Sequence, residues 1–311
     1  MRLFAAPMQG YTEAMWRRCH HELYGPADVE YIAPFVRIEK GEPRVRDMRD
    51  NLAPHDAGMS VEAQLIFRDA HEFRLIAERL YEGGCRRMNL NMGCPFVPQC
   101  RRGRGAAVIG SVRELGEVAE LMRGYGDVRF SVKMRLGHDD AGEWRRSVEV
   151  LNAMPLDYVA VHPRTAADQY GGPLRMADFS ELMSALNHPV VYNGELRTPA
   201  DIDSVLSAFP GISGVMAGRG LVARPSLFAE WASGEEWSED KRRGMFMRLH
   251  DMLAAEYEAT LCGQAQILSK LKPFWDYADG MFGHKTLKAI RKATTMQRYR
   301  EALPAGTQSL I

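Results

Sequence analysis

Short apolar runs alternate with amphipathic stretches along most of the chain. Eight runs have strand-like length and apolar, often β-branched, composition, and they lie at residues 3–6, 29–33, 63–66, 87–91, 128–134, 158–162, 190–192 and 214–217. The segments between them, such as 70–81, 112–123 and 143–153, repeat apolar residues at helical spacing. Eight strand and helix units predict a TIM (β/α)8 barrel, whereas a doubly wound open sheet would not need all eight.

The alternation stops before a polar stretch, 233–237, which predicts a linker. Ser238 is a typical helix N-cap residue, and the two acidic residues after it suit the positive end of a helix dipole. The remainder is almost entirely helix-forming. We therefore expect two domains, a barrel over residues 1–232 and a small helical domain over residues 238–311. One connection within the barrel, residues 34–60, is long and rich in Arg, Asp and Glu, as functional or mobile loops are.

The composition is that of an ordinary globular protein, with 46% apolar residues and enough length for a large core. The chain has no run of 18 apolar residues, and its first residues lack the regions of a signal peptide. We therefore expect a cytoplasmic protein without a membrane segment. Its five cysteines are scattered without C-x-x-C spacing, so neither a metal site nor a disulfide framework is expected.

The formal net charge is zero, but the charge is unevenly distributed along the chain. From Lys241 onward there are 12 Lys and Arg against 6 Asp and Glu, so the preceding part is acidic. A basic tail on an acidic body favours a polyanionic partner. Lys285, Lys288 and Lys292 are spaced so that they share one face of a predicted helix, which suits phosphate contacts. A merely solvated helix is the alternative.

Polar residues and glycines cluster where the predicted strands end. In a parallel barrel these ends meet on one face, where such proteins keep their reactive groups, so we expect the cluster to form one site. Its members are Pro7, Met8 and Gln9 at the first strand, Gln64 at the third, Cys94 at the fourth, Lys133 and Arg135 at the fifth, His162 and Arg164 at the sixth, Asn193, Gly194 and Glu195 at the seventh, and Gly218, Arg219 and Gly220 at the eighth.

The glycine-rich ends of strands seven and eight predict a phosphate site. Glycine allows a phosphate to approach the backbone closely, and Arg219 can pair with it, so a phosphate-bearing cofactor is expected. Lys133 is placed to stabilise negative charge on such a cofactor, and His162 to donate a hydrogen bond to the cofactor or the substrate. A surface lysine and a structural histidine are the alternatives for these two residues.

Cys94 is the only cysteine with a reactive context. It lies in the segment MNLNMGCP, residues 88–95, directly after a predicted strand and between a glycine and a proline. A thiol with a pKa near its reference value of about 8.5 is mostly protonated at neutral pH. Cys94 is therefore a candidate general acid, a role that contributes about 10²- to 10⁴-fold to a rate.

Together these motifs resemble those of the tRNA-dihydrouridine synthases. The likeness covers most of the chain, in order, at residues 6–8, 91–95, 103–107, 132–135, 161–165, 193–195 and 214–220. It implies a TIM barrel that holds FMN, a C-terminal helical domain that binds tRNA, and NADPH as reductant. It also implies that Cys94 protonates a uracil ring while reduced flavin supplies hydride, with Asn91 facing the uracil.

Carried over residue by residue, the resemblance implies a set of FMN contacts at Pro7, Met8, Gln9, Gln64, Lys133, His162, Asn193, Gly194, Glu195, Gly218 and Arg219. The candidate contacts to tRNA are Asn91, Arg164, Arg101, Arg104, Lys285, Lys288 and Lys292.

The chain departs from the family pattern at three places, which leaves the position of the reduced uridine and the local loop conformations open. Ile66-Phe67 replaces a frequent glycine, Pro163 replaces the glycine after His162, and three arginines follow Cys94. Dihydroorotate dehydrogenases are similar FMN barrels that act on a free pyrimidine, but the basic tail argues against that class. An RNA-binding protein on a degenerate barrel is the non-enzymatic alternative.

Overall fold

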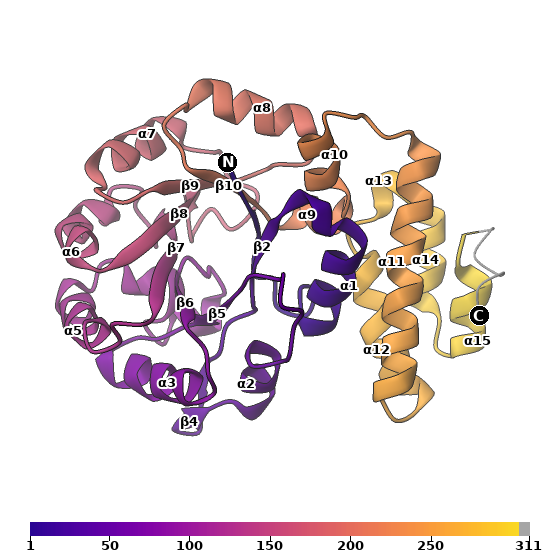
Figure 1. The fold of residues 1–311 in the computed structure, drawn as a ribbon, viewed down its shortest axis with the longest axis horizontal. Coiled ribbons are helices and arrows are strands. Elements are labelled where there is room, and N and C mark those ends of the chain that lie inside the picture. The colour runs from indigo at the N-terminus through magenta and orange to yellow at the C-terminus, as the bar shows by residue number, and fades with distance from the viewer. Residues whose placement is uncertain (305–311) are drawn as a thin grey trace.

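The computed structural model describes residues 1–304 and shows a closed parallel barrel followed by a group of helices (Figure 1). β1 pairs with both β2 and β10, which closes the barrel. The eight predicted strands and the TIM barrel are confirmed. The barrel strands are β1 (Arg2–Ala5), β2 (Val29–Ile32), β5 (Val61–Leu65), β6 (Arg87–Met92), β7 (Arg129–Gly137), β8 (Leu156–Thr165), β9 (Val190–Asn193) and β10 (Gly214–Ala217).

Helices surround the barrel and bury their apolar faces against it. In α3, Phe73, Ile76 and Leu80 are fully buried, as the helical spacing of the apolar residues predicted. Thr198 and Asp201 form a reciprocal capping box at the start of α8. The helices around the strands are α1 (Ala14–Tyr24), α3 (Ala70–Glu82), α5 (Val112–Met122), α6 (Val148–Ala153), α7 (Met176–Ala185), α8 (Pro199–Ala208), α9 (Arg219–Ala223) and α10 (Leu227–Ser233), with 3-10 turns η1 (Gly25–Ala27), η2 (Gly105–Val108) and η3 (Glu143–Arg146).

The amino ends of the strands are closed by a network of ion pairs. Glu30 accepts hydrogen bonds from Arg2 at 2.7 Å and from Arg87 at 2.5 Å, and Arg87 also reaches Glu62 at 3.2 Å. Burial raises the pKa of Glu62, whose carboxylate also accepts hydrogen bonds from Ser131 and Tyr158. A network at this end of the strands serves stability, since the reactive groups of these barrels lie at the other end.

The long connection 34–60 is folded. It contains a hairpin of β3 (Ile38–Glu39) and β4 (Glu42–Pro43), followed by α2 (Val45–Asn51). Asn51 ties it to the barrel, because its side chain donates to the Pro34 carbonyl at 2.7 Å and accepts from the Gln64 amide at 2.9 Å. A second short insertion, α4 (Val97–Cys100), follows β6.

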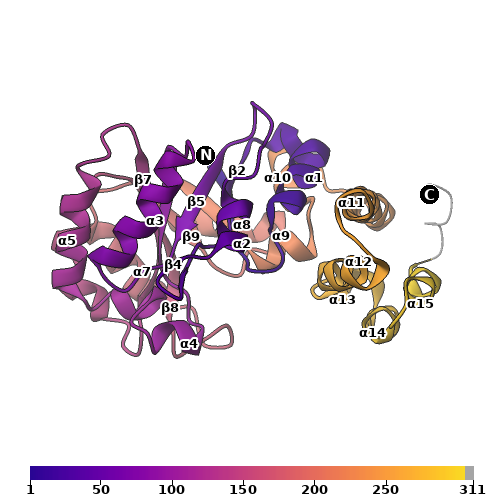
Figure 2. The ribbon, with the colours of Figure 1, turned by 90° about the horizontal axis from the view of Figure 1, so that it is seen from below.

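The C-terminal helices form their own packed group beside the barrel (Figure 2). They are α11 (Glu239–Thr260), α12 (Gln264–Leu271), η4 (Lys272–Trp275), α13 (Asp279–Phe282), α14 (His284–Lys292) and α15 (Met296–Ala302). Trp275 and His250 each contact the Tyr299 hydroxyl at 2.8 Å inside this group. Ser238 caps α11 as predicted, by accepting from the Lys241 amide. The end of the predicted range 238–311 lies outside the described residues.

Candidate active site

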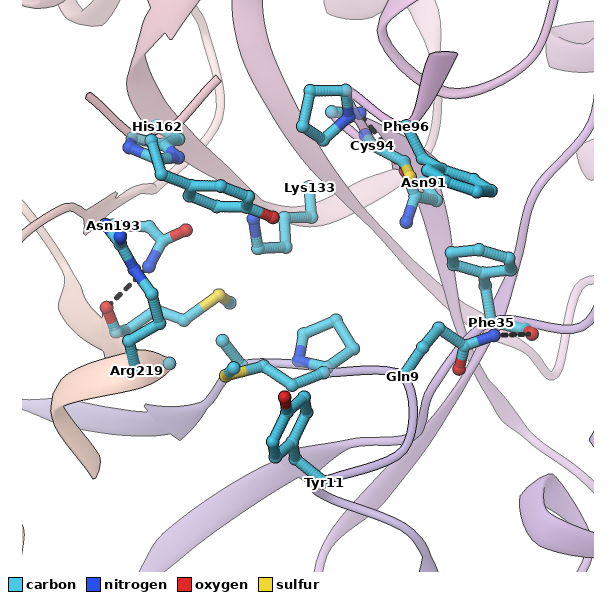
Figure 3. A pocket seen from close by; sticks show the side chains of 18 of the residues that line it. Gln9, Tyr11, Phe35, Asn91, Cys94, Phe96, Lys133, His162, Asn193 and Arg219 are labelled. Atoms are coloured by element: carbon cyan, nitrogen blue, oxygen red, sulfur yellow. Dashed lines mark hydrogen bonds between the residues drawn. The ribbon is translucent and has the colours of Figure 1, made fainter. Parts of the chain in front are cut away.

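A cavity of about 650 Å³ opens at the carboxyl ends of the barrel strands. Its wall comes from the loops after most strands, from the connection 34–60, and from Tyr277 of the C-terminal helical group. Figure 3 shows Cys94 and Asn91 on one side of the cavity, with His162, Asn193 and Arg219 on the other and Lys133 between them.

A relay of side-chain amides fixes the Cys94 loop. Asn91 Oδ1 accepts from the backbone amide of Cys94 at 2.9 Å and from that of Gly93 at 3.2 Å. Asn91 Nδ2 donates to Gln64 Oε1 at 2.9 Å, and Gln64 Nε2 donates to Asn89 Oδ1 at 2.7 Å. Asn91 therefore holds the loop that carries Cys94 and also lines the cavity.

The Cys94 thiol is set up to hold a proton. Burial raises the pKa of Cys94, while the nearby cations of Lys133 and Arg135 oppose that shift. The net effect is a thiol that stays protonated at neutral pH, with two cations near the thiolate that it becomes on losing the proton. This arrangement suits a general acid.

Lys133 is a cation that faces the cavity without a protein counter-ion. Burial, followed by repulsion from Arg135, lowers the pKa of Lys133 to about 8. Within residues 1–304 its ammonium group has neither a hydrogen-bond acceptor nor an ion-pair partner. Its position on β7, in the wall of the cavity, suits stabilisation of an anion there.

His162 is neutral, and its tautomer is fixed by a neighbour. Burial and the surrounding cations, led by Arg135 and Lys133, lower the pKa of His162 far below its usual range. Arg164 Nη1 lies 3.1 Å from His162 Nε2 and can only donate, so the proton of the neutral ring is on Nδ1. Arg164 also donates to Glu195 at 2.8 Å and to the Gly172 carbonyl at 2.6 Å.

Arg164 therefore contacts the His162 ring from the side away from the cavity. It is 5% exposed and lies outside the cavity wall. The guanidinium of Arg164 is already bound by protein groups, and its predicted substrate contact remains a prediction. Its role is to orient the His162 ring.

The ends of β9 and β10 form a close-packed cradle beside Arg219. A Cβ at Gly220 would lie 1.7 Å from the Leu196 carbonyl oxygen, and one at Gly218 would lie 3.3 Å from Met8 Sδ. Only glycine allows these two loops to approach so closely at Gly220. Arg219 is partly exposed in the cavity wall and donates to Glu195 at 2.6 Å. A bound anion could approach the backbone closely at these glycines and pair with the Arg219 guanidinium.

Glu195 holds three arginines in place around this cradle. Its carboxylate accepts from Arg164, Arg197 and Arg219, which lowers its pKa despite the opposing effect of burial. The residue has φ of 39°, in the left-handed region that a non-glycine residue adopts rarely. Such a conformation is maintained where surrounding contacts enforce it.

Two residues of the wall were not assigned a role from the sequence. The buried guanidinium of Arg135 joins β7 to the loop after β6 and to the end of β8 with its following loop, by donating to the carbonyls of Gly93 at 3.1 Å, Thr165 at 2.7 Å and Gln169 at 2.6 Å. The ring of Tyr170 lies 4.6 Å from the Arg219 guanidinium and 5.2 Å from that of Arg135. Arg135 had a sequence signal, its place at a strand end, whereas Tyr170 lies in a loop without one.

The structure brings most of the predicted site residues into one cavity wall. These are Pro7, Met8, Gln9, Asn91, Cys94, Lys133, His162, Asn193, Gly194, Glu195, Gly218 and Arg219. Gln64 is fully buried beneath Asn91, so its predicted cofactor contact remains a prediction.

The arginines after Cys94 separate into two kinds. Arg104 is 4% exposed and forms a two-pronged ion pair with Glu72, at 2.8 and 2.5 Å. The side chain of Arg104 is committed to this buried pair, and its predicted contact to tRNA remains a prediction. Arg101 is exposed, as are Lys285, Lys288 and Lys292 on α14, and their predicted contacts remain predictions.

Within residues 1–304, no group of three or more His, Cys, Asp or Glu side chains is arranged to hold a metal ion. No helix in the same range is long and apolar enough to cross a membrane.

Comparison with known proteins places these features in context. A family model described as dihydrouridine synthase matches residues 4–307. The Pseudomonas syringae protein named tRNA-dihydrouridine(16) synthase is 27% identical over 99% of this chain and 100% of its own length. The Pseudomonas putida tRNA-dihydrouridine synthase B is 27% identical over 73% of this chain and 67% of its own. Among solved structures, morphinone reductase aligns with a TM-score of 0.54 at 13% identity, covering 76% of this chain and 87% of its own, which supports the barrel fold alone.

Proposed function

The chain belongs to the dihydrouridine synthase family, and from this premise we propose that it reduces uridine in tRNA to 5,6-dihydrouridine, with bound FMN and with NADPH as reductant. The observation that carries the proposal is a protonated thiol, Cys94, in one cavity with a free cation, Lys133, and an anion cradle at Arg219. The same reasoning favours the cytoplasm, where tRNA is available to the enzyme.

The residues present fit FMN. The cradle at Gly218 and Gly220 with the Arg219 guanidinium suits the phosphate group. Lys133 would hold negative charge on the ring system, and His162 would present its Nδ1 proton as a hydrogen-bond donor. Bound FMN, reduced by NADPH, would supply hydride to one carbon of the uracil double bond.

Cys94 supplies the proton that completes the reduction after hydride transfer. Addition of hydride to one carbon of the C=C bond requires a proton at its neighbour, and the Cys94 thiol carries that proton at neutral pH. The thiolate formed is stabilised by Lys133 and Arg135 and regains a proton from solvent. One NADPH and one solvent proton are consumed for each dihydrouridine formed.

Position 16 is the uridine that we propose as the target. The relative with that position in its name matches this chain from end to end, including the basic C-terminal helices. The match to the Pseudomonas putida synthase B covers a smaller share of both chains. A shared C-terminal helical region supports a shared way of presenting the tRNA.

The direct test is mass analysis of dihydrouridine at each position of unmodified tRNA after incubation with the protein and NADPH. We expect one new dihydrouridine, at position 16. Formation at another position would contradict the proposed target, and no dihydrouridine at any position would contradict the proposed function. Oxidation of free dihydroorotate instead would support the free-pyrimidine class, which the family match already argues against.

Replacing Arg219 by Ala is expected to weaken FMN binding by about tenfold or more, because the change removes a charge-assisted contact to the phosphate. Riboflavin, which lacks the phosphate, should bind the parent and the variant equally. The measurement is quenching of flavin fluorescence on titration of the flavin-free protein. An equal loss for FMN and riboflavin would contradict a phosphate contact at Arg219.

The affinity for FMN is expected to fall as the pH rises through about 8. Lys133 loses its proton near this pH in the flavin-free protein. An anionic ligand binds the protonated form better, so deprotonation of the free protein opposes binding. In Lys133→Met the affinity should be lower at pH 7 and lack this pH dependence. An unchanged pH profile in Lys133→Met would show that another group titrates.

A further inference from the structure

Apolar side chains are exposed at the mouth of the cavity, directly after the reactive thiol. Phe96 is 58% exposed and lines the cavity beside Cys94 (Figure 3), and Val97 is 50% exposed at the start of α4. Only six large apolar side chains are exposed among residues 1–304, and Phe96, Val97 and Tyr170 are three of them. Exposed apolar groups gathered at one opening mark a binding surface.

Buried contacts on the inner side of α4 fix the segment that carries Phe96 and Val97. Gln99 is buried on the inner side of α4, and its backbone carbonyl accepts from the Arg104 amide at 3.1 Å. Arg104 in turn is fixed to Glu72 by its buried ion pair. The apolar residues therefore stay exposed because the other face of the segment is committed to the protein.

Two cations accompany the apolar side chains. The Arg101 amide donates to the Val97 carbonyl at 2.9 Å, so Arg101 lies one helical turn after Val97. Arg101 and Arg102 are both exposed, and neither guanidinium has a hydrogen-bond or ion-pair partner within the described chain. Proteins that bind single-stranded nucleic acid combine aromatic rings, on which bases stack, with cations that contact the phosphates.

The neighbouring loop is coupled to this segment. Gln169 Nε2 donates to the Pro95 carbonyl at 3.0 Å, which ties the residue before Phe96 to the residue before Tyr170. Seen from below, α4 lies along the same edge of the molecule as α14 with its exposed lysines (Figure 2). A polyanion that lies on the α14 surface can therefore extend to the cavity mouth.

We propose that Phe96 and Val97 form a stacking platform for a base next to the target uridine, and that Arg101 and Arg102 bind the adjoining phosphates. We call residues 96–102 the α4 platform. The proposal rests on the proposed function, since it assumes an RNA substrate. It assigns these residues to substrate binding, with Arg104 as the positioning residue that fixes the segment.

The chemistry of base extrusion explains why this site needs a platform. A uridine that reaches Cys94 has to leave its stack, so the base beside it loses a stacking partner at the mouth of the cavity. An exposed phenyl ring replaces that partner, because every base has a face that can stack on an aromatic ring. Arg101 and Arg102 neutralise the RNA phosphates that adjoin this stacked base.

The test measures binding of unmodified tRNA without NADPH, so that no turnover occurs. Phe96→Ala is expected to raise the Kd for tRNA about tenfold, the size expected for the loss of one stacked base. Phe96→Trp should restore parental affinity, because it keeps an aromatic face. Arg101→Gln with Arg102→Gln should reduce the salt slope of binding by about 1.4, at about 0.7 per phosphate of a single strand. Val112→Ala, an exposed apolar residue outside the cavity wall, is the control and should bind as the parent does.

The outcomes separate this proposal from the proposed function. If the parent protein forms no dihydrouridine in the same tRNA preparation, that result contradicts both the proposed function and the platform. With an active parent, an unchanged Kd in Phe96→Ala overturns the platform alone. An equal loss in Phe96→Ala and Phe96→Trp overturns stacking. A rise in the KM for NADPH larger than the rise in the Kd for tRNA would assign Phe96 to the reductant.

Discussion

Replacement of Cys94 by Ala is expected to lower the rate of dihydrouridine formation by about 10²- to 10⁴-fold, the usual contribution of a general acid. The variant removes the proton source and leaves the cradle at Arg219 and the Lys133 cation in place. FMN binding and reduction of the flavin by NADPH should therefore persist. Rapid-mixing absorbance at the flavin band measures the reduction step, and mass analysis of tRNA measures the product.

Cys100→Ala is the matched control. Cys100 is the nearest other cysteine in sequence, and its thiol donates to the Cys94 carbonyl oxygen at 3.3 Å, yet it lies outside the cavity wall. Loss of this contact should change the rate far less than loss of the Cys94 thiol. A Cys100→Ala protein without product, together with a Cys94→Ala protein at the parental rate, would mean that Cys100 is the acid.

The barrel could be predicted because each strand is a short apolar run set off from its neighbours. β6, for example, is buried along nearly its whole length, and its residues after Arg87 are apolar except for the two asparagines that carry the side-chain relay. The convergence of Cys94, Lys133 and Arg219 could also be predicted, because parallel strands of a closed barrel end on one face. In this topology, a residue that lies at the end of a strand in the sequence is expected to lie in the site.

Residues in the loops could not be predicted in this way. Arg101 and Arg104 stand three positions apart in one basic stretch, yet one is exposed and the other is buried against Glu72. The distinction depends on a carboxylate on α3, which is far from this stretch in sequence. Tyr170 was missed for the same reason, since its place beside Arg135 and Arg219 follows from how three loops meet.

The pKa values illustrate a further limit of sequence reasoning. A thiol with its reference pKa is mostly protonated at neutral pH, and burial of Cys94 strengthens that state. The direction for Lys133 could not be inferred from its neighbours in sequence, because its cause is burial within the barrel, with Arg135 adding to it. A cation whose pKa lies near 8 responds to a bound anion by holding its proton more firmly.

Changing Lys285, Lys288 and Lys292 together to Glu is expected to weaken tRNA binding by about 100-fold at low salt, at about 1 kcal/mol for each exposed contact. The three lysines share the outer face of α14, because Leu287 and Ile290 on the other face are fully buried. None of the three ammonium groups has a partner within the described residues, so each is free to meet a phosphate. The neighbouring Arg291 is less available, since it pairs with Asp276.

The salt dependence of binding separates this surface from a general effect of charge. Loss of three phosphate contacts should reduce the slope of log affinity against log salt by about 2 to 3. The matched control changes Arg79 on α3, Arg113 on α5 and Arg123 directly after α5 to Glu. It alters the net charge by the same amount, across the barrel from α14 (Figure 1). It should change the slope little, and thermal unfolding of both proteins checks that they are folded. Equal losses of affinity in the two variants would show that net charge decides binding, and an unchanged slope in the lysine variant would place the tRNA on another surface.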